Sequence, residues 1–160
     1  MGGWVLPYDK PILVVLGGQN ELDYVSRSLS RMGYDNVGGY LSGTIASWYT
    51  NALHTEKLSL ITVADLKEMM GKEKDLLVVD VRSLDEYNAG HIEGCKNVYA
   101  GLVEQHTDEI PRDRPVALIC KSGTRSGFAS SMLLRMGYTN IFNVLGGMTA
   151  WGKAGYPVTN

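Results

Sequence analysis

The sequence predicts an α/β fold in which helices cover a central parallel sheet. Short apolar runs alternate along the chain with stretches that have the apolar spacing of helices, which is the pattern of βα units. One strand–loop–helix segment occurs twice, and in its second copy a cysteine opens the loop. Because sites in such sheets lie outside the carboxyl ends of the strands, this cysteine stands where a site is expected.

The first strand–helix segment begins at Pro11. The apolar run 12–15 predicts a buried strand, and Gly33 stands where a glycine would end the following helix. Four residues between them have helical spacing, namely Leu22, Val25, Leu29 and Met32.

A complete α/β unit is expected from Leu58 onward. Its continuous apolar strands are typical of a parallel sheet that is covered on both faces. The predicted elements in chain order are a strand at 60–62, a helix that Thr62 caps and Gly71 ends, a strand at 75–81, a short helix at 84–90, a strand at 95–98, a polar helix to about Ile110, a strand at 115–119, a helix at 126–136 and a strand at 141–145.

The internal repeat aligns residues 11–41 with residues 115–145 at an offset of 104 positions, without a gap. Nine of the 31 aligned positions are identical, and the apolar pattern also agrees, so both copies predict the same local fold. The identical residues are Pro11/Pro115, Ser26/Ser130, Leu29/Leu133, the Arg-Met-Gly-Tyr runs at 31–34 and 135–138, Asn36/Asn140 and Leu41/Leu145.

The two copies differ in their loops. Leu16 occupies the position of Cys120, and Glu21 occupies the position of Arg125. A carboxylate at that point repels an anion, so we interpret the first copy as catalytically inactive. We expect a partial half-domain at 1–50, a linker at 51–57 and a complete domain at 58–160.

The composition excludes several classes of protein. A net charge of −2 predicts no general attraction to nucleic acid or to an anionic membrane. No apolar run has the length of a membrane span, and the N-terminus does not resemble a secretory signal. Two cysteines without a CxxC pair predict neither a disulfide framework nor a zinc site, and they fit a reducing cytoplasm.

The loop that begins at Cys120 has the features of an anion site. It joins an apolar strand to a helix, whose N-terminus offers unpaired N–H groups and a positive dipole end, and successive loop amides can form an anion nest. These groups lower the pKa of a thiol. A buried structural cysteine is the alternative, which the polar loop disfavours. The remaining loop residues are Lys121, Ser122, Gly123, Thr124, Arg125 and Ser126.

Residues 58–160 resemble a single rhodanese domain, which implies a three-layer α/β/α fold with a central parallel sheet. The first fifty residues resemble the C-terminal half of an inactive rhodanese unit. The matching segments are Val79-Asp80-Val81-Arg82, Glu86-Tyr87, Gly90-His91-Ile92, Gly94, Asn97, the cysteine loop, Gly146-Gly147-Met148-Thr149-Ala150-Trp151 and Ala154-Gly155-Tyr156-Pro157-Val158.

The resemblance implies a sulfurtransferase. Its nucleophile would be Cys120, which takes sulfane sulfur from thiosulfate or a persulfide and passes it to a thiol or to cyanide. The amides of residues 121–126 would hold the persulfide anion, and Lys121 and Arg125 would attract the anionic donor. No cofactor and no metal are expected, because the intermediate is a covalent persulfide on Cys120.

Four other residues are expected to support the site or the core. Asp80 and Arg82 favour a structural ion pair at the end of a neighbouring strand, and Arg82 could also bond to Glu86. For His91 a hydrogen-bonded structural role is favoured over that of a base. Cys95 is interpreted as a small core residue, with a resolving thiol as the alternative.

Two other functions stay open at this point. A sulfur carrier or regulatory module of a larger protein would hold sulfur on Cys120 with poor turnover. A rhodanese-like cysteine phosphatase is more remote, because such enzymes place Cys and Arg six positions apart, whereas Arg125 is five after Cys120.

The segment 3–9 resembles the approach to the rhodanese repeats in fusions of metallo-β-lactamase and rhodanese domains. This resemblance implies an upstream domain of the metallo-β-lactamase fold as a partner.

Overall fold

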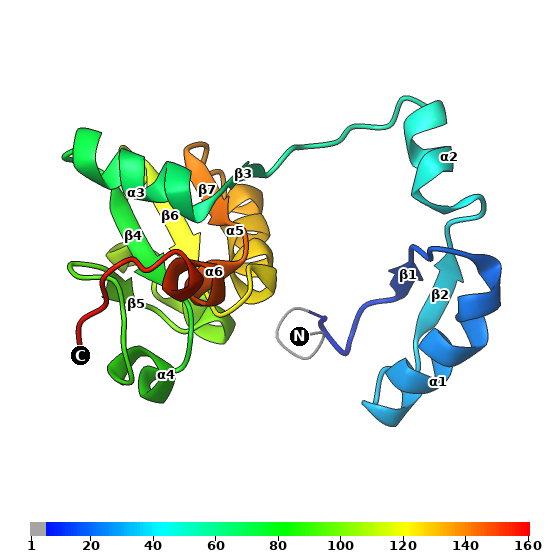
Figure 1. Cartoon of the computed structure of the whole chain (residues 1–160). Helices are drawn as coiled ribbons and strands as arrows, with labels where there is room; N and C mark the ends of the chain where they lie inside the picture. The colour runs from blue at the N-terminus through cyan, green and yellow to red at the C-terminus, as the bar shows by residue number, and fades with distance from the viewer. Residues whose placement is uncertain (1–5) are drawn as a thin grey trace. The chain divides into compact units, whose positions relative to one another are not determined.

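The structure is a computed structural model that describes residues 6–160 (Figure 1). The chain forms two compact units, Met1–Glu56 and Lys57–Asn160. Within residues 6–160, no helix combines the length and the apolar character that crossing a membrane requires. Residues 3–5 of the segment that resembles a fusion protein lie outside the described residues.

The second unit is built on a five-stranded parallel sheet with the strand order β3-β7-β6-β4-β5. Its fully buried central strand, β6, has hydrogen-bonded neighbours on both edges. The strands are β3 (Ser59–Ile61), β4 (Leu77–Asp80), β5 (Lys96–Asn97), β6 (Val116–Ile119) and β7 (Ile141–Val144).

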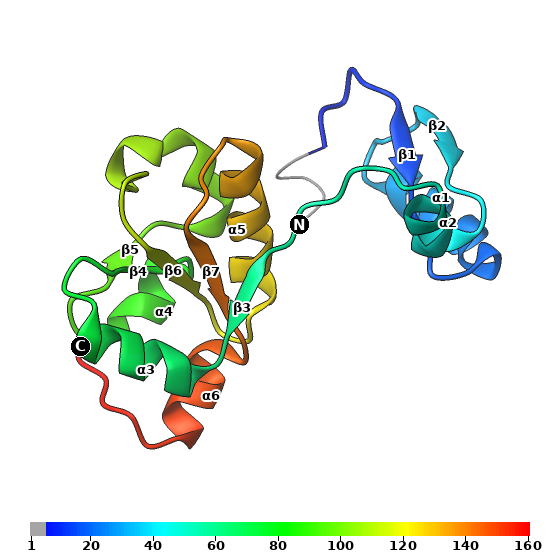
Figure 2. The same cartoon turned by 90° about the horizontal axis from the view of Figure 1, so that it is seen from above.

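Helices flank this sheet, which confirms the predicted α/β fold with a central parallel sheet. Helices α3 and α6 pack together on one face, and α5 packs with η3 on the other (Figure 2). The helices are α3 (Val63–Lys72), α4 (Leu84–Asn88), η3 (Ala100–Gln105), η4 (Thr107–Glu109), α5 (Thr124–Arg135) and α6 (Gly147–Lys153).

The start of α3 follows the prediction, but its end does not. Thr62 accepts the N–H of Asp65, and the Asp65 carboxylate accepts the N–H of Thr62, which forms a capping box. The helix continues through Gly71 to Lys72. Gly71 does not have the left-handed backbone that ends a helix, so the prediction that it terminates α3 was wrong.

The predicted polar helix before Ile110 is replaced by two short 3-10 helices, η3 and η4. Gly101 weakens an α-helix at this point. Ala100 and Val103 are fully buried, and residues three apart share one face of a 3-10 helix. Burial of this pair therefore fits the tighter helix.

The core between α3, α6 and the sheet is centred on Trp151 and Leu66, both fully buried. The indole N–H of Trp151 donates to the carbonyl of Pro157 at 2.9 Å, which satisfies its polar group in the core. Trp151 is therefore a packing residue of this core.

The first unit contains a two-stranded parallel sheet covered by one helix, within the part of it that the structure describes. Its core consists of Val14, Leu16, Leu29 and Tyr34. The elements are β1 (Ile12–Val14), η2 (Gln19–Glu21), α1 (Leu22–Arg31), β2 (Val37–Tyr40) and α2 (Thr44–Thr50).

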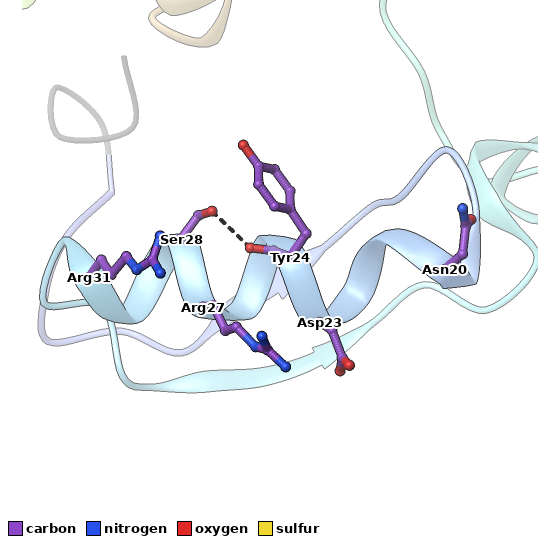
Figure 3. Close-up of a pocket in the computed structure, with 6 residues that line it drawn as sticks. All are labelled: Asn20, Asp23, Tyr24, Arg27, Ser28 and Arg31. Carbon is purple, nitrogen blue, oxygen red and sulfur yellow. Dashed lines mark hydrogen bonds between the residues drawn. The ribbon is translucent and has the colours of Figure 1, made fainter.

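Helix α1 has the amphipathic character that the sequence predicts. Leu22, Val25 and Leu29 pack at the core of the first unit. Met32 lies just past the helix and is exposed, because Gly33 turns the chain with a φ of +82°. The prediction that Met32 belongs to the apolar face of this helix was therefore wrong. The polar side of α1 and Asn20 of η2 line a shallow pocket (Figure 3). The residues that α1 contributes are Asp23, Tyr24, Arg27, Ser28 and Arg31.

The sheet of the first unit exposes apolar side chains whose counterparts in the second unit are buried. Leu13 is 76% exposed and Val15 is 52% exposed, whereas their counterparts Ala117 and Ile119 are fully buried. In the second unit, α3, α6 and the strands on either side of β6 and β7 cover this region. The two aligned segments therefore share a local strand–helix fold but differ in burial.

We expect Leu133→Ala to lower the free energy of unfolding by about 2–5 kcal/mol, because this fully buried leucine leaves a cavity. Urea unfolding followed by circular dichroism measures the change. The control is Leu84→Ala in the same unit, which removes an exposed leucine and should cost less than about 0.5 kcal/mol. Equal losses for both variants would contradict this assignment of the core.

Candidate active site

Cys120 lies at the carboxyl end of the central strand β6 and opens the Cys120 loop (residues 120–126), which leads into α5. Gly123 precedes the first residue of α5 and has a φ of +97°, a conformation that glycine adopts without strain. The cysteine is fully buried. The loop therefore turns the chain directly around a buried sulfur atom.

Hydrogen-bond donors converge on the Cys120 sulfur. The N–H of Gly123 donates to Sγ at 3.2 Å, and the hydroxyl of Ser126 lies 3.4 Å from Sγ. Burial by itself raises the pKa of the thiol, but the Ser126 hydroxyl and the backbone of Ser126, Ser122 and Gly123 outweigh it and lower the pKa. The loop thus favours a thiolate.

Asn143 supports Ser126 from strand β7. The Ser126 hydroxyl donates to Asn143 Oδ1 at 2.6 Å, and both side chains are buried. A hydroxyl has one hydrogen, so donation to Asn143 and donation to Sγ alternate. Asn143 was not predicted as a site residue, although an amide within an otherwise apolar strand was a usable signal.

The start of α6 fastens the Cys120 loop from the other side. The N–H of Met148 donates to the carbonyl of Cys120 at 2.7 Å, and the N–H of Thr149 donates to that of Lys121 at 3.0 Å. Gly147 has a φ of +53°, and a Cβ there would lie 2.1 Å from the Cys120 carbonyl oxygen. Only glycine permits this close approach.

Arg125 forms a bidentate ion pair with Glu86 at the start of α4. Its two terminal nitrogens donate to the carboxylate at 2.6 and 2.8 Å, and this lowers the pKa of Glu86 to about 2. The expected contact between Arg82 and Glu86 was wrong, because Arg125 reaches across from α5 and takes both oxygens. Arg125 therefore carries a partner rather than a free charge.

Asp80 and Arg82 form the ion pair that the sequence favoured. Arg82 Nη2 lies 2.6 Å from Asp80 Oδ2 and also donates to the carbonyl of Gly90 at 2.8 Å. Both side chains are buried. The pair joins the end of β4 to the turn after α4, and so fixes the strand edge beside the Cys120 loop.

His91 is held by structural contacts. Its ring stacks on Tyr87 with the centroids 3.8 Å apart, and Nδ1 lies 3.1 Å from the Tyr87 carbonyl. Its backbone pairs with Thr159. These contacts favour the structural role over that of a base.

The second cysteine, Cys95, packs in the core beside Ile92 and Ile119. Burial, with a further contribution from the Asp80 charge, raises the pKa of its thiol to about 11. A protonated buried thiol is a poor nucleophile. Within residues 6–160, no three His, Cys, Asp or Glu side chains are grouped so that they could hold a metal ion.

A shallow pocket lies beside the Cys120 loop. Its lining consists of Arg82, Glu86, Ala89, Lys121, Met148 and Thr149. Lys121 is exposed and makes no ion pair with any residue between 6 and 160. Its charge is therefore available to a ligand.

The corresponding loop of the first unit lacks these features. Leu16 is buried at the position of Cys120, and the Glu21 carboxylate accepts the N–H of Gly17 at 3.1 Å. A carboxylate of the chain itself thus bonds to an amide of this loop, in keeping with the absence of a nucleophile.

Residues 62–154, more than half of the chain, match the family described as the rhodanese-like domain. The chain belongs to the rhodanese-like family. A rhodanese-related protein from Thermoplasma volcanium of known structure is 35% identical, with a TM-score of 0.58, and the match covers 64% of this chain and 98% of that one.

Three curated relatives also match the rhodanese-like unit. A sulfurtransferase from Allochromatium vinosum is 34% identical, covering 58% of this chain and 87% of that protein. The thiosulfate sulfurtransferase GlpE from Pseudoalteromonas translucida is 32% identical, covering 59% and 89%. The putative sulfur carrier protein YrkF from Bacillus subtilis is 31% identical, covering 57% of this chain and 49% of that protein.

We expect Gly147→Ala to destabilise the rhodanese-like unit by about 2 kcal/mol or more, because its Cβ collides with the Cys120 carbonyl at a positive φ. Urea unfolding tests this. The matched control is Gly152→Ala in the same helix, where a Cβ meets open space. This substitution should leave the free energy of unfolding unchanged or raise it by up to about 1 kcal/mol. The same effect at both positions would contradict the fastening role of α6.

We expect Ser126→Ala to raise the pKa of Cys120, because it removes a hydroxyl that favours the thiolate. The rate of iodoacetamide alkylation rises with pH as the thiolate forms, so its midpoint should move to higher pH. The control Ser131→Ala removes an exposed hydroxyl of α5 that bonds to Gly127 and should leave the midpoint in place. An unchanged midpoint in Ser126→Ala would refute this role.

Proposed function

We propose that the chain is a sulfurtransferase that carries sulfane sulfur as a persulfide on Cys120. The observation that supports this most strongly is the convergence of the Gly123 amide and the Ser126 hydroxyl on a buried sulfur atom with a lowered pKa. Such donors stabilise a thiolate and, after reaction, the anionic outer sulfur of a persulfide.

The proposed reaction has two displacements. The Cys120 thiolate attacks the outer sulfur of thiosulfate, a new S–S bond forms, and the old S–S bond breaks with its electron pair leaving on sulfite. A thiolate or cyanide then attacks the outer sulfur of the persulfide, and the electron pair returns to Cys120. Charge balances in both steps, and no cofactor or external oxidant is required.

The charged residues have separate roles in this proposal. Lys121 draws the anionic donor toward the loop, since it makes no ion pair with another described residue. Arg125 acts through Glu86 and fixes the loop against α4. Asp80, Arg82 and His91 keep the strand ends in place and take no part in the chemistry.

The relatives support both an enzyme and a carrier. One is named a thiosulfate sulfurtransferase and another a putative sulfur carrier protein. The carrier is therefore the second candidate, in which Cys120 accepts sulfur and hands it to a particular thiol without rapid turnover. A phosphatase is less well supported. Its arginine would have to bind a phosphate, whereas both terminal nitrogens of Arg125 already donate to Glu86.

The first unit is proposed to be an inactive rhodanese-like half-domain. Its loop has Leu16 in place of a nucleophile, and its own Glu21 carboxylate accepts a loop amide. We further propose a cytoplasmic location, a thiol acceptor and an upstream partner domain of the metallo-β-lactamase fold, on the sequence features given above.

We expect the chain to turn over thiosulfate and cyanide, and Cys120→Ser to reduce the rate to background. Cys95→Ser, which changes the buried second thiol, is the matched control and should retain the activity. Thiocyanate formation is the readout. No turnover by the unaltered chain, together with sulfur transfer from Cys120 to a thiol, would favour the carrier; activity that persists in Cys120→Ser would exclude the mechanism.

A further inference from the structure

The charges beside the Cys120 loop are largely neutralised by pairing. Asp80 pairs with Arg82, and Glu86 pairs with Arg125. Lys121 is the remaining cation in the pocket lining, among the residues that the structure describes. The Cys120 thiolate itself adds a negative charge, which opposes the attraction of Lys121 for an incoming anion.

Glu86 is the residue that sets this balance. Its side chain is one-third exposed and lines the pocket, so its charge acts on a donor that enters the pocket as well as on Arg125. Without its charge, both Arg125 and Lys121 would attract an anion. A carboxylate at this position therefore weakens the binding of a doubly charged donor more than the binding of a singly charged donor.

We propose that Glu86 is a specificity-determining residue that makes the site favour singly charged sulfane donors over doubly charged ones such as thiosulfate. This inference rests on the proposed sulfurtransferase function. The preferred class is an organic persulfide or thiosulfonate with one negative charge. The electrostatic penalty grows with the charge of the donor, whereas the attack on its outer sulfur is the same.

Glu86 also has a structural role that a test must preserve. It accepts the N–H of Ser83 and completes the capping box of α4. Gln serves in this position of a capping box as well as Glu. Glu86→Gln therefore removes the charge and keeps the cap, which separates the electrostatic effect from the loss of a helix start.

Two donors isolate the effect of charge. Methanethiosulfonate has the same S–SO2 bond as thiosulfate but carries one negative charge, and it leaves as methanesulfinate when the Cys120 thiolate takes its outer sulfur. The quantity measured is the ratio of kcat/KM for thiosulfate to kcat/KM for methanethiosulfonate. Differences in folding or in the fraction of active protein cancel in this ratio.

We expect Glu86→Gln to raise this ratio by about three- to tenfold and to make it fall more steeply with added salt. The control is Glu104→Gln, which also removes one negative charge and an ion pair with an arginine, Arg135, but lies on η3. It should leave the ratio unchanged. A Glu86→Gln ratio equal to that of the unaltered chain, or an equal rise for both donors, would overturn the proposal.

A second variant keeps the proposal testable if Glu86→Gln does not fold. Lys121→Gln removes the free cation and should lower the same ratio, because thiosulfate loses more attraction than the singly charged donor. An unchanged ratio in Lys121→Gln would contradict charge control of donor choice. Failure of the unaltered chain to take sulfur from either donor would instead refute the proposed function itself.

Discussion

The hydrogen bonds that surround the Cys120 sulfur are the constraint on which the rest of the site depends. A thiolate with no solvent exposure is unfavourable unless donors replace the lost water. The Gly123 amide and the Ser126 hydroxyl supply this replacement, and they do so only while the loop keeps its shape. The loop follows strand β6 and leads into α5, and backbone N–H groups at the start of α6 donate to the loop carbonyls. Three elements therefore position the Cys120 sulfur atom.

Residues 11–41 align with residues 115–145, and a comparison of these two segments separates the site from the fold beneath it. Both copies form a parallel strand pair with a covering helix. In the first copy, however, every polar residue of the site is changed: Leu16, Glu21, Leu22 and Gly39 stand where Cys120, Arg125, Ser126 and Asn143 stand in the second. Apolar periodicity and the glycine after the helix are shared by the two segments, whereas the side chains around Cys120 are not.

Local patterns made most of the fold and the position of the Cys120 loop predictable. Continuous apolar runs indicated the strands, the Thr62 cap indicated the start of α3, and the polar loop before a helix marked Cys120. The Glu86–Arg125 and Ser126–Asn143 contacts were not predicted, because each joins residues far apart in sequence through the tertiary fold. The 3-10 geometry of η3 was not predicted for a similar reason, because it depends on the burial of Ala100 and Val103 in the tertiary fold.

Intact-protein mass spectrometry after treatment with thiosulfate or methanethiosulfonate shows directly whether Cys120 carries sulfur, when the unaltered chain is compared with Cys120→Ser. We expect a gain of one sulfur atom in the unaltered chain, its removal by cyanide or a thiol, and no gain in the variant. No gain in the unaltered chain with either donor, or an equal gain in Cys120→Ser, would contradict the claim that this loop exists to hold sulfur on Cys120.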